Sequence, residues 1–171
     1  HREVGGDFRC GCDRAGAVGF LQQAGLANGF AVEEAATVQL DGLRVSSTGV
    51  RNALGVADFT LAEALLGRPF QIAGRVLHGQ KLGRQLGAPT ANIQLKRKRV
   101  PLTGVYLVSI ELDGQVWPGA GNIGVRPSVK SDGLAHLEVH LLDYAGDLYG
   151  RHLGVTFHRK LRDEQRFASL D

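Results

Sequence analysis

The sequence predicts an α+β protein in two parts, an α/β region over residues 1–66 and an antiparallel β-structure over residues 67–171. In the first part apolar residues recur at helical spacing, whereas beyond residue 67 they alternate with polar residues, as in half-buried strands. Turns rich in glycine and aspartate separate the alternating runs at short intervals, which favours a compact barrel or sandwich. The segment GRPF, residues 67–70, marks the change of pattern.

The first part is predicted to mix helices with a strand. Residues 15–25 predict a helix closed by its final glycine, because glycine readily takes the left-handed conformation at a helix end. Residues 30–42 contain several β-compatible residues and predict a strand. Two further helices are expected, one over residues 49–54 and one that begins near Asp58 and stops at Gly67.

The second part is predicted to be built from short strands. Alternation of apolar and polar residues indicates strands over residues 70–77, 103–112, 136–144 and 152–161. The segments LDGQ and YAGD are expected to form turns between them. Residues 162–171 return to helical spacing and predict a helix at the end of the chain.

The composition indicates which class of protein this is and which kinds of partner it can bind. Among the 171 residues 43% are hydrophobic and 22% charged, which is typical of a globular protein and excludes disorder on composition. A net charge of +3 suits a small anionic ligand such as a nucleotide, and neither nucleic acid nor a membrane is an expected partner. Cys10 and Cys12 suffice for neither a disulfide framework nor a zinc site, so a cytoplasmic setting is expected.

A glycine-rich segment over residues 74–92, GRVLHGQKLGRQLGAPTAN, is the first candidate site. Glycine backbone approaches phosphates closely, and its N–H groups form an anion-binding concavity. The candidate nucleotide-binding residues are Gly74, Gly79, Lys81, Gly83, Arg84 and Pro89, with Lys81 and Arg84 as possible phosphate partners. Thr90 and Asn92 are two residues apart, so in an extended segment they point the same way and offer hard oxygen ligands for Mg²⁺. The alternative is a polar loop whose side chains bond to the local backbone.

The run HLEVH is the second candidate site. On a strand, His136, Glu138 and His140 share one face. One interpretation makes Glu138 the general base for a hydroxyl nucleophile, and another makes the three residues a metal site. A third is a solvated strand face without a chemical role.

The segment VSSTGVR is a candidate phosphate site at a helix start. Hydroxyl groups, free backbone N–H groups and the helix dipole together favour an anion there. The residues concerned are Ser46, Ser47, Thr48 and Arg51. The alternative is a simple helix cap.

The run KRKR, residues 96–99, is the densest cluster of positive charge in the chain. It is short and lacks interleaved aromatic residues, which counts against a nucleic-acid patch. A solvated loop or strand edge is the favoured interpretation.

A series of motifs in the second part carries a resemblance to a known family. In order they are G-x-V-x-H-G, G-R-x-L-G-x-P-T-A-N, GVYLV, NIGVRPS, LEVHLLDY, DLYG and LRDEQRF. Their order and spacing resemble the riboflavin kinase module of bacterial bifunctional riboflavin kinase/FAD synthetases, over residues 67–171. That module is a Greek-key β-barrel of roughly six strands, so the resemblance implies the same fold here.

The first part is similar to the latter portion of the FMN adenylyltransferase module that precedes the kinase in that family. The similarity rests on VGGDFRCG and VSSTGVRNAL, and it is looser at Cys10 and Cys12. The H-x-G-H-type nucleotide motif that opens such a module has no counterpart in residues 1–66. An incomplete nucleotidyltransferase domain is therefore expected there.

The resemblance implies a reaction and roles for the candidate residues. It implies phosphorylation of riboflavin by ATP, giving FMN and ADP, with Mg²⁺ held by Thr90 and Asn92 and with Glu138 as base. It places Tyr149 with the nucleotide, and Arg162 and Phe167 near the flavin. The alternatives are full synthesis of FMN and FAD and, more remotely, a metal-binding barrel through His136, Glu138 and His140.

Overall fold

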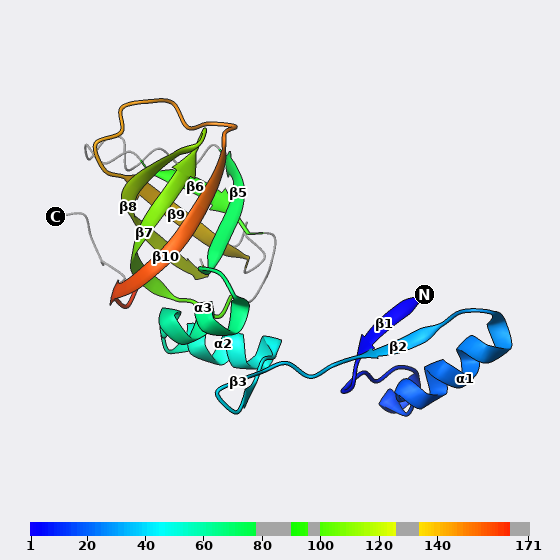
Figure 1. The fold of residues 1–171 in the computed structure, drawn as a ribbon. Coiled ribbons are helices and arrows are strands. Elements are labelled where there is room, and N and C mark those ends of the chain that lie inside the picture. Colours follow the sequence, from blue (N-terminus) through cyan, green and yellow to red (C-terminus); the bar gives the residue numbers. More distant parts are fainter. Residues whose placement is uncertain (78–89, 96–99, 126–133, 165–171) are drawn as a thin grey trace. The chain divides into compact units, whose positions relative to one another are not determined.

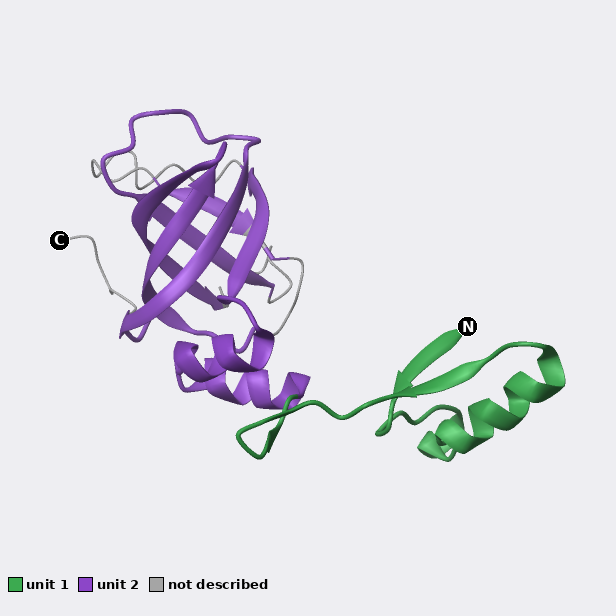
Figure 2. Cartoon of the chain, in the orientation of Figure 1, with its two compact units in different colours: residues 1–45 green, residues 46–171 purple. Residues whose placement is uncertain are grey.

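The computed structural model describes residues 1–77, 90–95, 100–125 and 134–164. The chain divides into two compact units, residues 1–45 and residues 46–171 (Figure 2). No helix in the described ranges is long and apolar enough to cross a bilayer.

The unit of residues 1–45 is a small α/β arrangement. Its elements are β1 (Arg2–Gly5), the 3₁₀ helix η1 (Cys12–Arg14), α1 (Val18–Asn28), β2 (Val32–Ala35), β3 (Gln39–Leu40) and β4 (Leu43–Arg44). Strands β1 and β2 pair in parallel, and α1 is part of the connection between them. The strand predicted over residues 30–42 is therefore two separate strands, β2 and β3.

The end of the first helix was wrongly predicted. Gly25 lies inside α1 and is buried, and a side chain at this position would clash with the carbonyl oxygen of Phe30. The helix instead ends at Gly29, whose φ of 73° is the left-handed conformation that closes helices. Gly25 thus allows close packing, and Gly29 caps the helix.

The unit of residues 46–171 begins with two helices whose ends follow the predicted caps. These are α2 (Ser47–Gly55) and α3 (Phe59–Leu66). The Ser46 hydroxyl accepts a hydrogen bond from the Gly49 N–H at 3.1 Å, and the Asp58 carboxylate accepts one from the Leu61 N–H at 2.9 Å. Gly67, with φ of 70°, closes α3.

Six strands then form a closed antiparallel barrel, drawn from green to orange-red in Figure 1. They are β5 (Gln71–Leu77), β6 (Ala91–Gln94), β7 (Gly104–Leu112), β8 (Gln115–Val125), β9 (Ala135–Leu141) and β10 (His152–Arg162). Their order around the barrel is β10–β5–β6–β9–β8–β7. Strands β7, β8 and β9 pair consecutively and β6 lies beside β9, which is a Greek key.

The barrel interior and the two helices share one hydrophobic core. Alternate residues of each strand face inward, as in β9, where Leu137 and Val139 are fully buried. Ala53, Leu54 and Ala62 of α2 and α3 belong to the same core cluster. The helices cover one end of the barrel in Figure 1.

Candidate active site

The outer face of the barrel carries a row of residues that pair across all six strands. Neighbours in an antiparallel ladder lie side by side on one face of the sheet. From β5 to β10 the row is Leu77, Asn92, Glu138, Asn122, Val105 and Arg162. It brings together three residues predicted from the sequence, namely Asn92, Glu138 and Arg162.

Asn92 and Glu138 are direct partners in the β6–β9 ladder. Both face outward, because Ile93 and the neighbours of Glu138 on β9 are buried in the core. Both are nevertheless half-buried, which places an amide and a carboxylate together in a partly desolvated position. Thr90 immediately precedes β6 and is half-buried too. Since Ala91 faces inward, Thr90 shares the outer side with Asn92.

Asn122 of β8 completes this polar row on the other side of Glu138. Its Oδ1 atom is buried and makes no hydrogen bond within the described part of the chain. Asn122 belongs to the motif NIGVRPS, and no role was predicted for it. The available signal was a single amide between glycine and isoleucine in a segment of small and apolar residues.

Strand β8 was not predicted, because glycines and a proline interrupt its alternation. Close packing explains why glycine occupies these positions of β8. A side chain at Gly119 would clash with the carbonyl oxygen of His140 and with Ile110, since the neighbouring strand and the core approach closely there. A side chain at Gly124 would collide with the Glu164 carboxylate, so the Glu164 side chain lies against the outer face of β8.

Comparison with known proteins bears on this site. The riboflavin kinase (flavokinase) family matches residues 66–171, which is more than half of the chain. The chain belongs to the riboflavin kinase family. The match includes the whole barrel and every residue of the outer row.

The curated relatives are longer proteins. The bifunctional riboflavin kinase/FMN adenylyltransferase of Pseudomonas fluorescens is 74% identical over 171 residues, covering 100% of this chain and 55% of the relative. The protein of the same name from Escherichia coli strain K12 is 52% identical over 169 residues, covering 98% of this chain and 54% of the relative. The chain therefore spans about half the length of these relatives.

A solved structure is similar as well. The crystal structure of a macrolide-efflux protein from Streptococcus pneumoniae aligns with a TM-score of 0.68 and 32% identity. The alignment covers 97% of this chain and 53% of that chain. The similarity supports the order of helices and barrel strands described above.

Other predicted residues of the kinase site lie apart from the row. Gly74 faces the barrel interior, where a side chain would come within 2.6 Å of Ile93, so its missing side chain also has a packing reason. Tyr149 lies in the loop between β9 and β10 and packs against the core; its backbone N–H donates to the Asp147 carboxylate at 3.1 Å. The nucleotide roles of Gly74 and Tyr149 stay predictions.

Several predicted residues lie outside the described residues. They are Gly79, Lys81, Gly83, Arg84 and Pro89 of the glycine-rich segment, the cations 96–99, and Phe167. Most of the predicted C-terminal helix, residues 162–171, also falls there, although β10 extends to Arg162.

The serine-rich segment before α2 has a structural role. The Ser46 hydroxyl caps the helix, as the alternative interpretation expected. Ser47, Thr48 and Arg51 lie exposed on the first turns of α2. Their binding of a phosphate stays a prediction.

The metal alternative on β9 finds no support. Among the described residues, no group of three or more His, Cys, Asp or Glu side chains could hold a metal ion. His136, Glu138 and His140 all belong to the described residues, so their shared face does not amount to such a site.

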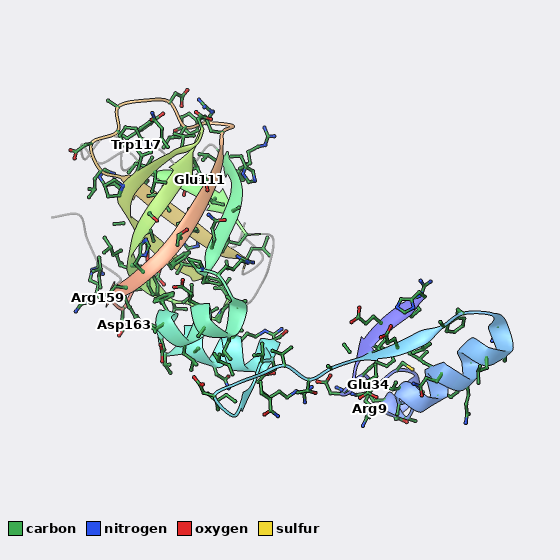
Figure 3. The ribbon with its side chains drawn as sticks, viewed as in Figure 1. Arg9, Glu34, Glu111, Trp117, Arg159 and Asp163 are labelled. Carbon is green, nitrogen blue, oxygen red and sulfur yellow. The ribbon has the colours of Figure 1, made fainter. Side chains whose placement is uncertain are left out.

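Charged groups gather at the β10 end of the row. The Lys160 ammonium lies 2.6 Å from the Asp163 carboxylate. Their hydrogen bond raises the pKa of Lys160 and lowers the pKa of Asp163. Figure 3 shows Asp163 with Arg159 at the opposite end of the barrel from Trp117. Arg162 is exposed beside this pair, and its guanidinium donates a hydrogen bond to the Asp163 carbonyl oxygen at 3.2 Å.

Proposed function

We propose that this chain transfers the γ-phosphoryl group of ATP to the 5′-hydroxyl of the ribityl chain of riboflavin, giving FMN and ADP. Family membership supports the reaction. The pairing of Asn92 with Glu138 on the outer barrel face is the structural observation that carries the proposal.

Glu138 accepts the proton of the attacking hydroxyl. The hydroxyl oxygen then forms a bond with the γ-phosphorus, the bond from that phosphorus to the β,γ-bridging oxygen breaks, and ADP leaves with the electron pair. Positioning and electrostatic stabilisation supply most of the rate in such a transfer, and a general base contributes a further share. The half-buried position of Glu138 suits this role, because it keeps the carboxylate partly shielded from water.

Thr90 and Asn92 would hold Mg²⁺. The donor set fits the ion, because a hydroxyl and an amide oxygen are hard ligands and Mg²⁺ shares its remaining positions with water and substrate phosphates. The two side chains are on one side of an extended segment, with the Glu138 carboxylate beside Asn92. When bound, Mg²⁺ would neutralise part of the negative charge on the phosphates of ATP.

The remaining assignments place the two substrates on either side of Glu138. Thr90 and Asn92 follow the glycine-rich segment directly in the chain, so we place ATP beside these two residues. Arg162 ends the row on the β10 side, where we place the flavin. Riboflavin would then lie along the outer face of β8, with the end of its ribityl chain at Glu138.

The test is a pair of matched glutamate substitutions. Glu138→Gln keeps the shape of the side chain and removes its basicity, so kcat should fall by about 10²- to 10⁴-fold while riboflavin binding changes little. Glu111→Gln is the control, because Glu111 is exposed on β7 outside the row and should leave kcat unchanged (Figure 3).

The assay separates riboflavin, FMN and FAD by chromatography after incubation with ATP and Mg²⁺. FMN formation by the unmodified chain is the expected result, and its absence would overturn the proposal. FAD in the same incubation would add the second activity that the relatives' names carry. An unchanged kcat in Glu138→Gln would remove Glu138 from the mechanism.

A further inference from the structure

Asn122 presents a buried hydrogen-bond acceptor that the described part of the chain leaves unused. Its Oδ1 atom has no partner among the described residues. An amide oxygen removed from water without a replacement hydrogen bond destabilises a folded protein. Buried polar atoms are otherwise nearly always satisfied, so an exception calls for an explanation.

The position of Asn122 points to a substrate rather than to a structural partner. In the ladders it is the direct partner of Glu138 on one side and of Val105 on the other, and Val105 is the partner of Arg162. It faces outward with Glu138, because Gly121 and Ile123 face the core. Asn122 therefore lies between the proposed base and the residue at the flavin end of the row.

The side chain of Glu164, which follows β10, lies close to the same part of β8. The Glu164 carboxylate lies against Gly124, which is two residues from Asn122 and on the same face of β8. Asn92 and Thr90 are on the other side of Glu138, one strand further away. Asn122 is thus separated from the proposed Mg²⁺ ligands by the base itself.

We propose that the Asn122 amide oxygen accepts a hydrogen bond from a hydroxyl group of the ribityl chain, next to the hydroxyl that Glu138 deprotonates. This rests on the proposed function. The oxygen can only accept, so its partner must be a donor, which a fully ionised phosphate is not. Adjacent strands are ~4.8 Å apart, a distance over which a polyol presents several successive hydroxyl groups.

The consequence is selectivity for the polyol part of the flavin. Asn122 should bind the ribityl chain and contribute nothing to binding of the isoalloxazine ring. Lumiflavin carries the ring with a methyl group in place of the ribityl chain. The two flavins therefore separate a contact with the chain from a contact with the ring.

The experiment measures flavin binding to the full chain by fluorescence, with ADP and Mg²⁺ present, for Asn122→Ala and for Asn122→Ser. Asn122→Ala should weaken riboflavin binding by about 3- to 10-fold and leave lumiflavin binding unchanged. Asn122→Ser keeps an acceptor oxygen and should recover part of the loss. Gln115→Ala is the matched control, because Gln115 is an exposed amide on the same strand.

Two further readouts exclude other roles. Without flavin, Asn122→Ala should melt at the same temperature as the unmodified chain or higher, because it removes an unsatisfied buried group; a lower melting temperature would indicate a structural role. The Mg²⁺ concentration needed for half-maximal FMN formation should be unchanged. A large increase would assign Asn122 to the metal and overturn the inference.

The outcomes distinguish this inference from the proposed function. If the unmodified chain forms FMN but Asn122→Ala binds riboflavin normally, or loses both flavins equally, only the assignment of Asn122 fails. If the unmodified chain neither binds riboflavin nor forms FMN, the proposed function fails and the inference fails with it.

Discussion

At the scale of single residues, the outer row shows how a site arises on a barrel surface. Asn92 and Glu138 are distant in sequence, and the β6–β9 ladder makes them neighbours. A carboxylate on an open strand face would be fully solvated, whereas Glu138 is half-buried. The proposed role of Glu138 thus depends on strand register, because a slip of one residue would turn every side chain of β9 to the opposite face.

The Lys160–Asp163 pair gives a prediction about protonation. The Lys160 ammonium lowers the pKa of Asp163 below its ordinary value of 3.8. The ion pair therefore stabilises the fold above the ordinary pKa of Asp163, and the effect is lost as pH falls through the lowered pKa. Carboxyl ¹³C NMR titration should give a midpoint below 3.8 for Asp163, and Lys160→Gln should return it toward that value. Asp163→Asn identifies the resonance; a midpoint that Lys160→Gln leaves in place would contradict the pairing.

The same residues show what the sequence could and could not predict about the site. Alternation in HLEVH placed Glu138 on one face of a strand, and the Thr90–Asn92 spacing placed both side chains together. Which strand pairs with β9 depends on how the barrel closes, so the pairing of Asn92 with Glu138 could not be derived from sequence spacing. No role was predicted for Asn122 because the glycines of β8 interrupt the alternation that marks a strand. These glycines are needed where residues from other parts of the chain pack closely against β8.

At the scale of elements, local signals predicted the helices of the second unit and most of the barrel strands. The ends of α2 and α3 are set by local interactions of Ser46, Asp58 and Gly67 with nearby backbone groups. Helix ends of this kind can therefore be predicted from the sequence alone. The end of α1 was wrongly predicted because Gly25 allows close packing against Phe30 and does not cap the helix. A glycine can serve either purpose, and only tertiary contacts decide which.

An aromatic cluster joins the helices to the barrel and gives a stability prediction. Phe157 of β10 is 2% exposed, stacks with Phe59 of α3 at 6.3 Å and meets Tyr106 edge-on at 5.5 Å. Phe157→Ala should lower the free energy of unfolding by about 3–5 kcal/mol, because it removes buried surface and leaves a cavity. Leu161→Ala is the control on the same strand; its side chain is exposed and its effect should stay within about 0.5 kcal/mol. Urea unfolding measures both, and equal midpoints would contradict the role of the cluster.

At the scale of the whole molecule, the division of the chain raises the question of where the barrel domain begins. The sequence pattern changes at residue 67 and the family match begins at residue 66. The compact unit in the structure begins at residue 46. The difference is the helical pair α2 and α3, whose residues Ala53, Leu54 and Ala62 lie in the barrel core.

Two truncations decide the boundary. A chain of residues 46–171 keeps the whole core cluster, so its barrel should unfold at the same urea concentration as in the full chain. A chain of residues 67–171 loses the helices and exposes the core surface beneath Leu54, which is 2% exposed in the intact unit. Burial of one such side chain contributes about 1.5–3 kcal/mol, and the helices bury several, so the shorter chain should be less stable by at least about 3 kcal/mol. The two truncated chains differ only in residues 46–66, which makes each the control for the other. Equal stability would place the boundary at residue 67 and make the helices an appendage, whereas the expected loss makes them part of the domain that carries the site.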